Sequence, residues 1–174
     1  MAIKGIIFDN QAPTAKGIRS GFHSALSDGI IDGCGTNQSS GFNLNIAPGY
    51  MHVAGGIFYV QGGQTVALSY DSTKTYARVK AVMNLSQAAT TEAFSQISFV
   101  VDYATAANTF TNLVQEDVNL GGGTIYEAEI FVVQLNSTGI SKYVRTAIAS
   151  AKLQYGDTLP EDAPEGTIYL LKVT

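Results

Sequence analysis

Apolar and polar residues alternate along much of the chain. Between Phe42 and Ile46, the apolar side chains Phe42, Leu44 and Ile46 are separated by Asn43 and Asn45. A period of two is typical of a β-strand with one buried and one solvated face. The same period returns in three longer segments, at 76–85, 97–103 and 124–135. The pattern therefore predicts a mainly β protein.

Glycine pairs divide the segment 50–70 into three short apolar runs. The runs are 50–54, 57–60 and 65–70, separated by Gly55-Gly56 and Gly62-Gly63. Glycines at this spacing favour tight hairpin turns. We therefore predict a three-stranded meander.

The two longest predicted strands carry charged residues on one face. In 76–85, Arg78 and Lys80 lie opposite a face of small apolar residues. In 124–135, Glu127 and Glu129 lie opposite a face formed by Tyr126, Ala128, Ile130 and Val132. At Phe131 and Val133, however, both faces of the second strand become apolar. A strand buried on both faces predicts cover by a second sheet or by a neighbouring subunit.

The remaining elements complete the predicted architecture. A short helix is predicted at 19–27, ending at Asp28-Gly29, and 143–151 fits a strand or a short helix, with the strand favoured. Residues 159–166 form a linker rich in proline and acidic residues, before a terminal strand at 167–173. We predict an antiparallel β-sandwich with one short N-terminal helix, in three parts: an attachment segment at 1–35, the sandwich at 36–155, and the linker with its strand at 156–174.

The chain carries few charges and is weakly acidic. Only 14% of its residues are charged and the net charge is −4, whereas an ordinary soluble domain has about 25% charged residues. Without a Lys/Arg cluster, neither a nucleic-acid groove nor an anionic membrane surface is expected. No apolar run approaches the roughly 20 residues that span a bilayer, and the run 6–8 is too short for a signal peptide. Weak surface charge gives little protection against self-association, so we expect an oligomer.

Residues with catalytic or metal-binding chemistry lack suitable neighbours in sequence. The two histidines, His23 and His52, stand in no nucleophile motif, and Cys34 is the single cysteine. Glu127 and Glu129, or Asp102, are the carboxylates that a polysaccharide hydrolase would use, but a polar strand face explains them better. We therefore expect no enzyme activity, no cofactor and no metal.

Tyrosines are frequent, with 9 in the chain, and exposed tyrosine is common at sugar-binding and protein-binding surfaces. A half-buried strand position is the alternative for each of them. His52 joins these candidates because strand alternation turns it outward. The candidate interface or glycan contacts are Tyr50, His52, Tyr59, Tyr76 and Tyr143.

Two stretches carry a resemblance to a known family. The first is Phe22-His23-Ser24-Ala25-Leu26-Ser27-Asp28-Gly29-Ile30-Ile31 followed by residues 41–62, a short helix ahead of a glycine-punctuated meander. It resembles a module near the start of tail and baseplate proteins of phages that infect Gram-positive bacteria. The second, residues 64–88, is similar to the shoulder domain of lactococcal siphophage receptor-binding proteins. The resemblance implies a trimeric β-sandwich that anchors to the baseplate. No stretch corresponds to the family's separate saccharide-binding head domain, so no binding residue is carried over.

The sequence thus leads to three functional hypotheses. The first is a non-enzymatic structural component of a phage or prophage tail tip or baseplate, located in the virion, that forms a homotrimer and docks other tail or receptor-binding parts through residues 3–25. The second is a carbohydrate-binding module that recognises cell-surface saccharides and is monomeric. The third, the hydrolase, has the weakest support.

Overall fold

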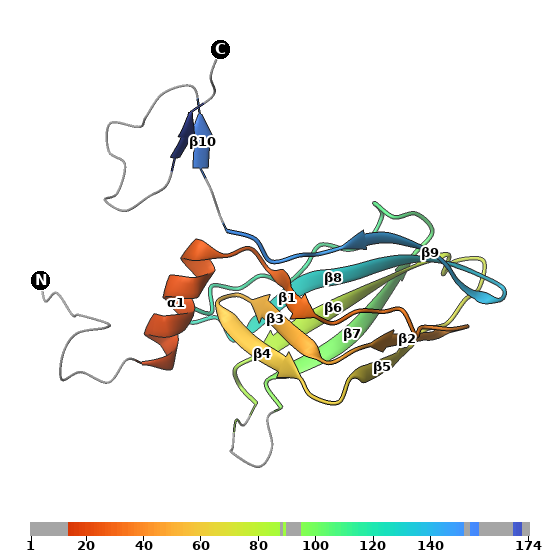
Figure 1. The fold of residues 1–174 in the computed structure, drawn as a ribbon, viewed down its shortest axis with the longest axis horizontal. Helices are drawn as coiled ribbons and strands as arrows, with labels where there is room; N and C mark the ends of the chain where they lie inside the picture. Colours follow the sequence, from red (N-terminus) through yellow and green to blue (C-terminus); the bar gives the residue numbers. More distant parts are fainter. Residues whose placement is uncertain (1–13, 88, 90–94, 152–153, 157–168, 172–174) are drawn as a thin grey trace, which may run out of the picture.

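The protein is a two-layered antiparallel β-structure with one helix at one end, as the computed structural model in Figure 1 shows. The structure describes residues 14–87, 89, 95–151, 154–156 and 169–171. One layer is a four-stranded sheet in the order β7-β6-β8-β9, formed by β6 (Tyr76–Asn84), β7 (Ile97–Ala104), β8 (Ile125–Asn136) and β9 (Gly139–Thr146). The prediction of a mainly β, sandwich-like fold with a short helix is confirmed.

The second layer consists of a three-stranded sheet and a separate strand pair. The sheet has the order β1-β3-β4, with β1 (Gly29–Gly33), β3 (Gly49–Val53) and β4 (Gly56–Val60). The pair joins β2 (Asn43–Ile46) to β5 (Gln64–Ala67). Residues 29–33 had no predicted strand, because the run is short and glycine stands at both of its ends.

The predicted meander is wrong in its third strand. β3 and β4 form the expected hairpin, but β5 pairs with β2 and not with β4. Gly62 and Gly63 both have positive φ, 71° and 81°, a conformation that costs glycine little. They carry the chain past the end of β4 to β2, where Leu44 pairs with Val66 and both side chains enter the core.

The hydrophobic core lies between the two layers. Leu44, Ile46, Met51 and Val53 of one layer are fully buried against small residues of β6. The β6 residues are Ala77, Val79, Ala81 and Met83, the face that the sequence pattern predicted. Burial of a full aliphatic side chain contributes about 1.5–3 kcal/mol, so this seam is the main source of stability.

A β-bulge in β8 changes which of its residues face the core. Val79 of β6 pairs with Phe131, whereas the next residue, Lys80, pairs with Glu129, so Ile130 is an extra residue on β8. A bulge turns the side chains beyond it to the opposite face.

Beyond the bulge, Phe131, Val133 and Leu135 belong to the core, and Val132 is in register with Arg78 and Arg145 on the outer face. The predicted common face of Tyr126, Ala128, Ile130 and Val132 is therefore wrong at Val132. The bulge also explains why both faces of this segment are apolar.

Helix α1 (Ala15–Ala25) rests on one end of the sandwich and begins earlier than the predicted 19–27. Its N-cap is Thr14, whose hydroxyl oxygen accepts a hydrogen bond from the Gly17 amide at 3.0 Å. No residue of α1 is buried, although its side chains form an apolar stripe. Among the described residues, no helix is long and apolar enough to cross a membrane.

In the C-terminal part, some predicted strands are confirmed, and other predictions fall on residues that the structure does not describe. The strand favoured for 143–151 is confirmed as far as Thr146, and Ile148 and Ala151 form only isolated bridges. β10 (Gln154–Gly156) pairs in parallel with β11 (Tyr169–Leu171), which lies within the predicted terminal strand. The predicted linker at 159–166 and residues 3–13 of the predicted attachment segment lie outside the described residues.

Candidate functional site

Tyr50 and Tyr59 form an exposed aromatic pair on the outer face of the β3–β4 hairpin. They are register partners, with ring centroids 4.8 Å apart and an angle of 33° between the ring planes. Their side chains are 47% and 51% exposed. Because Met51 and Val60 face the core, alternation turns the two tyrosines outward. This is the one cluster that the structure builds from the predicted contact residues.

The other two tyrosine candidates lie in the four-stranded sheet. Tyr76 is half-buried at the start of β6. Tyr143 of β9 is exposed, and its hydroxyl donates a hydrogen bond to the Thr36 carbonyl oxygen at 3.4 Å. The four candidate tyrosines therefore do not form a single surface.

His52 is not exposed as predicted, because other segments cover its side chain completely. The residue paired with His52 on β1 is Gly29. Because Gly29 has no side chain, the neighbouring segment can pack closely against His52. His52 Nδ1 lies 3.0 Å from the Ser27 carbonyl oxygen and 3.6 Å from Asp28 Oδ1. Alternation alone could not reveal this cover, which comes from residues remote in sequence.

Asp28 connects three segments beneath α1. Its carboxylate accepts hydrogen bonds from the Ala54 amide at 2.7 Å and from the Tyr126 hydroxyl at 3.0 Å. Burial, and then the negative charge of Asp28, raise the pKa of Tyr126 far above its usual value. The sequence pattern marked Asp28 only as the end of the predicted helix, whereas its carboxylate links the start of β1 to the end of β3 and to β8.

A charged network covers the outer face of the four-stranded sheet. Arg78 donates to Asp102 at 2.7 Å, and Lys80 lies 3.0 Å from Asp102 and 2.8 Å from Glu127. Both cationic side chains are nearly buried, at 6% and 8% exposure. Burial opposes ionisation of Asp102, but hydrogen bonds from Arg78 and Lys80 and their positive charges outweigh it, so the pKa of Asp102 is lowered. The face predicted to be solvated is thus largely dry.

The loop between β7 and β8 provides the cover. The Thr111 carbonyl oxygen accepts a hydrogen bond from Arg78 at 2.7 Å, and the Phe110 ring lies 4.9 Å from the Arg78 guanidinium carbon. The Val114 amide donates to Glu127 at 2.9 Å. These contacts hold the charged network against the sheet.

The predicted carboxylates therefore have structural partners. Glu127 and Asp102 belong to the network, and Glu129 accepts two hydrogen bonds from Arg145 at 2.9 and 3.2 Å. The interpretation favoured from sequence for Glu127 and Glu129 was a polar strand face, and the structure adds a cationic partner for each of them and for Asp102. Within the described ranges, no group of three or more His, Cys, Asp or Glu residues is placed to hold a metal ion.

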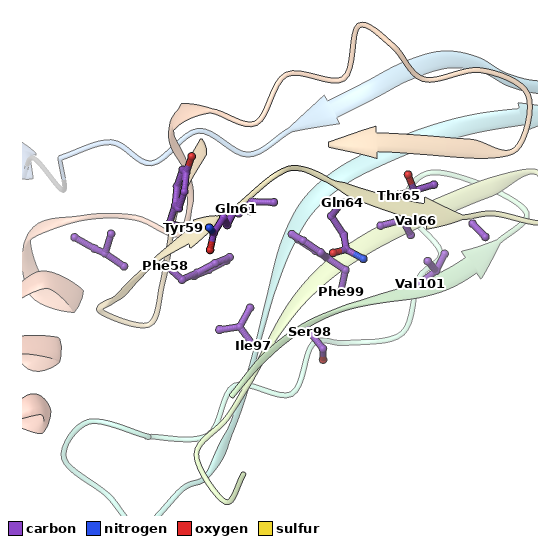
Figure 2. A pocket seen from close by; sticks show the side chains of 13 residues that line it. Phe58, Tyr59, Gln61, Gln64, Thr65, Val66, Ile97, Ser98, Phe99 and Val101 are labelled. Atoms are coloured by element: carbon purple, nitrogen blue, oxygen red, sulfur yellow. The ribbon is translucent and has the colours of Figure 1, made fainter. Parts of the chain in front are cut away.

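A groove of about 830 Å³, lined by apolar, hydroxyl and amide side chains, runs along the open side of the sandwich. Figure 2 shows that β4 and β5 form one wall and β7 the other. None of the described side chains lining this open-side groove is charged. The lining residues are Ile57, Phe58, Tyr59, Val60, Gln61, Gln64, Thr65, Val66, Ala67, Ile97, Ser98, Phe99 and Val101.

Two smaller hollows flank the groove. A hollow of about 350 Å³ beside α1 shares Ile57 and Ile97 with it and includes Ile18 and Phe22. Ile18, Phe22 and Ile57, together the helix-end patch, are 38%, 39% and 46% exposed. The other hollow, of about 460 Å³, is lined by Asn37, Gln38, Asn45, Gln64 and Thr65 together with glycines and other small residues.

A scan against protein-family models finds no match for this chain, and a search of curated proteins finds none either.

Proposed function

We propose that this protein is a non-enzymatic structural component of a phage or prophage tail tip or baseplate, that it assembles as a homotrimer in the virion, and that it docks other tail or receptor-binding parts. The proposal starts from the resemblance of residues 22–62 and 64–88 to tail and shoulder modules. Its structural support is the helix-end patch.

The helix-end patch supports assembly because α1 is poorly covered in a single chain. An isolated helix of 11 residues is marginal in water, and most helix stability in proteins comes from packing of an apolar face. In α1 that face carries Ile18 and Phe22, both more than one third exposed. Contact with further copies would bury this face together with Ile57. Ile18 and Phe22 of this patch also belong to residues 3–25, the proposed attachment side.

Light scattering across a concentration range tests the proposal. We expect a stable species near three times 18.4 kDa. Phe22→Lys places a charge in the middle of the helix-end patch and should shift the mass to that of a monomer. Ile148→Lys is the control, because Ile148 is 59% exposed and lies outside the patch. A wild-type monomer at every concentration, or a trimer that survives Phe22→Lys, would count against this assembly.

The second candidate function, binding of cell-surface saccharides, is favoured by the Tyr50–Tyr59 pair. The pair lies on the same strands that lead to Pro48 and Gly62 of the amide-lined hollow. Aromatic rings stack on sugar faces, and neutral amides bond sugar hydroxyls without requiring charge.

A glycan array followed by calorimetry with neutral oligosaccharides tests the second candidate. Tyr59→Ala should abolish binding, whereas Tyr70→Ala, at a tyrosine that is 38% exposed elsewhere, should retain it. Binding that is unaffected by Tyr59→Ala would exclude the Tyr50–Tyr59 pair as the platform.

A further inference from the structure

The free edge of β7 is an open site for pairing with another strand. β7 is the outermost strand of its sheet and, among the described residues, pairs only with β6. Its sequence, ISFVVDYA, has no Pro or Lys, the residues that commonly protect sheet edges. Its one charged residue, Asp102, is held by Arg78 and Lys80. An unprotected, mostly apolar edge beside an uncharged groove is an arrangement that can bind an extended segment.

We propose that the open-side groove binds residues 3–8 of the same chain, as an extended strand that pairs with the free edge of β7. These residues are Ile3-Lys4-Gly5-Ile6-Ile7-Phe8. Ile and Phe favour strands, and a largely apolar segment suits a groove whose described lining has no charge. This inference goes beyond the proposed assembly and does not depend on it.

The path of the chain supports its own segment as the occupant. Ala15 and Ile18, in the first turns of α1, line the same hollow as Ile97, the first residue of β7. Residues 9–13 can span about 17 Å when extended, and the hollow beside α1 shares Ile57 and Ile97 with the groove. A segment that runs along the edge toward Ile97 and then enters α1 is antiparallel to β7, like every other pairing in this sheet.

One register satisfies the chemistry on both faces of the added strand. If Ile7 lies opposite Phe99, Ile7 and Ile3 face the groove, which also holds Phe58 and Val101. On the outer face, Ile6 then covers Val100, which is 41% exposed. Lys4 falls opposite the carboxylate of Asp102, which is 23% exposed. A shift by one residue would turn Lys4 into the groove, whose described lining offers no opposite charge.

Hydrogen exchange of the β7 amides tests the proposal on the full chain. We expect residues 97–104 to exchange on the order of tenfold or more slowly in the full chain than in a variant lacking residues 1–12. Ile7→Asp should accelerate exchange as the deletion does, whereas Gln11→Asp adds the same charge outside the proposed strand and should not. Equal exchange in the full and truncated chains would overturn the proposal.

A cross-link identifies which copy supplies the strand. In the proposed register Ile6 and Val100 are directly opposite, within disulfide reach, so Ile6→Cys with Val100→Cys should form a bond within one chain. Ala2→Cys with Val100→Cys is the mismatched control. A covalent dimer on a non-reducing denaturing gel would assign the strand to a second copy and overturn the proposal. The native mass by light scattering tests the homotrimer separately, because its result does not depend on which segment occupies the groove.

Discussion

Replacing Asp102 with Asn removes one negative charge from the network on the outer face of the sheet. Asn is nearly isosteric with Asp, so little volume changes. Before the substitution, Arg78 and Lys80 face two carboxylates, Asp102 and Glu127. Afterwards two nearly buried cations share one carboxylate, while the Thr111 carbonyl oxygen still accepts from Arg78.

The expected loss of stability follows from the burial of these groups. Removing one partner of a buried ion pair costs about 3–5 kcal/mol. Asp102 is 23% exposed and Glu127 remains, so we expect the lower part of this range or slightly less, about 2–3 kcal/mol. For a protein of this size, that corresponds to a fall in Tm of roughly 5–10 °C.

Urea denaturation at pH 7 measures this loss as a lower midpoint with an unchanged slope. Asp32→Asn is the control, because Asp32 is exposed on β1. The lowered pKa of Asp102 means that its stabilising contribution is complete above the unfolded-state pKa and disappears as pH falls through the lower folded-state pKa. The difference between wild type and variant should therefore shrink at acid pH. A loss at pH 7 below about 0.5 kcal/mol would refute the assigned role of the network.

Three further predictions concern single side chains. Gly55→Ala should lower Tm and increase proteolysis in α1, because Gly55 has φ 88° and an added Cβ would overlap the Arg19 carbonyl oxygen. Gly62→Ala is the control: Gly62 also has positive φ but has open space around it, so this variant shows the effect of backbone strain without the overlap. The Cys34 thiol should react with a thiol reagent only on unfolding, because burial and then the Asp32 charge raise its pKa; rapid reaction of the native protein would contradict its burial. Tyr126 should resist ionisation in an alkaline absorbance titration, since its pKa is raised. The free energy of unfolding should fall as pH rises above about 10, the pKa of tyrosine in the unfolded chain. Tyr126→Phe should remove the resistant group from the titration.

Local patterns in the sequence predicted the strands but not all of their partners. The alternation at 42–46, 76–85 and 97–103 placed three strands within a residue or two. The pairing of β5 with β2 depends on the path of the Gly62-Gly63 turn, and a period of two carries no information about which strand lies alongside. The bulge at Ile130 is equally invisible, because an apolar residue there fits either face.

In the candidate site too, the outward direction of some side chains could be predicted from the sequence, whereas their cover by other segments could not. Tyr50 and Tyr59 could be predicted as outward because each lies between core residues of a simple hairpin. His52 obeys the same alternation, yet Ser27 and Asp28 cover it, and such cover depends on the tertiary fold. Arg78 and Lys80 were placed on the correct face, but their burial requires a loop more than 30 residues away in sequence. The open-side groove has no sequence signal, because it forms between strands of different layers.

The extra residue in β8 divides this strand into two segments with opposite tolerance to substitution. Up to Ala128, even-numbered positions face the core, whereas from Phe131 onward the odd-numbered positions do. A scan that places Lys at each position in turn should therefore show the core-facing sensitive sites changing parity across Ile130, with the fully buried Val132 as an additional sensitive site on the outer face. Deleting that single residue would make β8 a regular strand that keeps its pairs with β6, so Ala128, Phe131 and Val133 would still face the core.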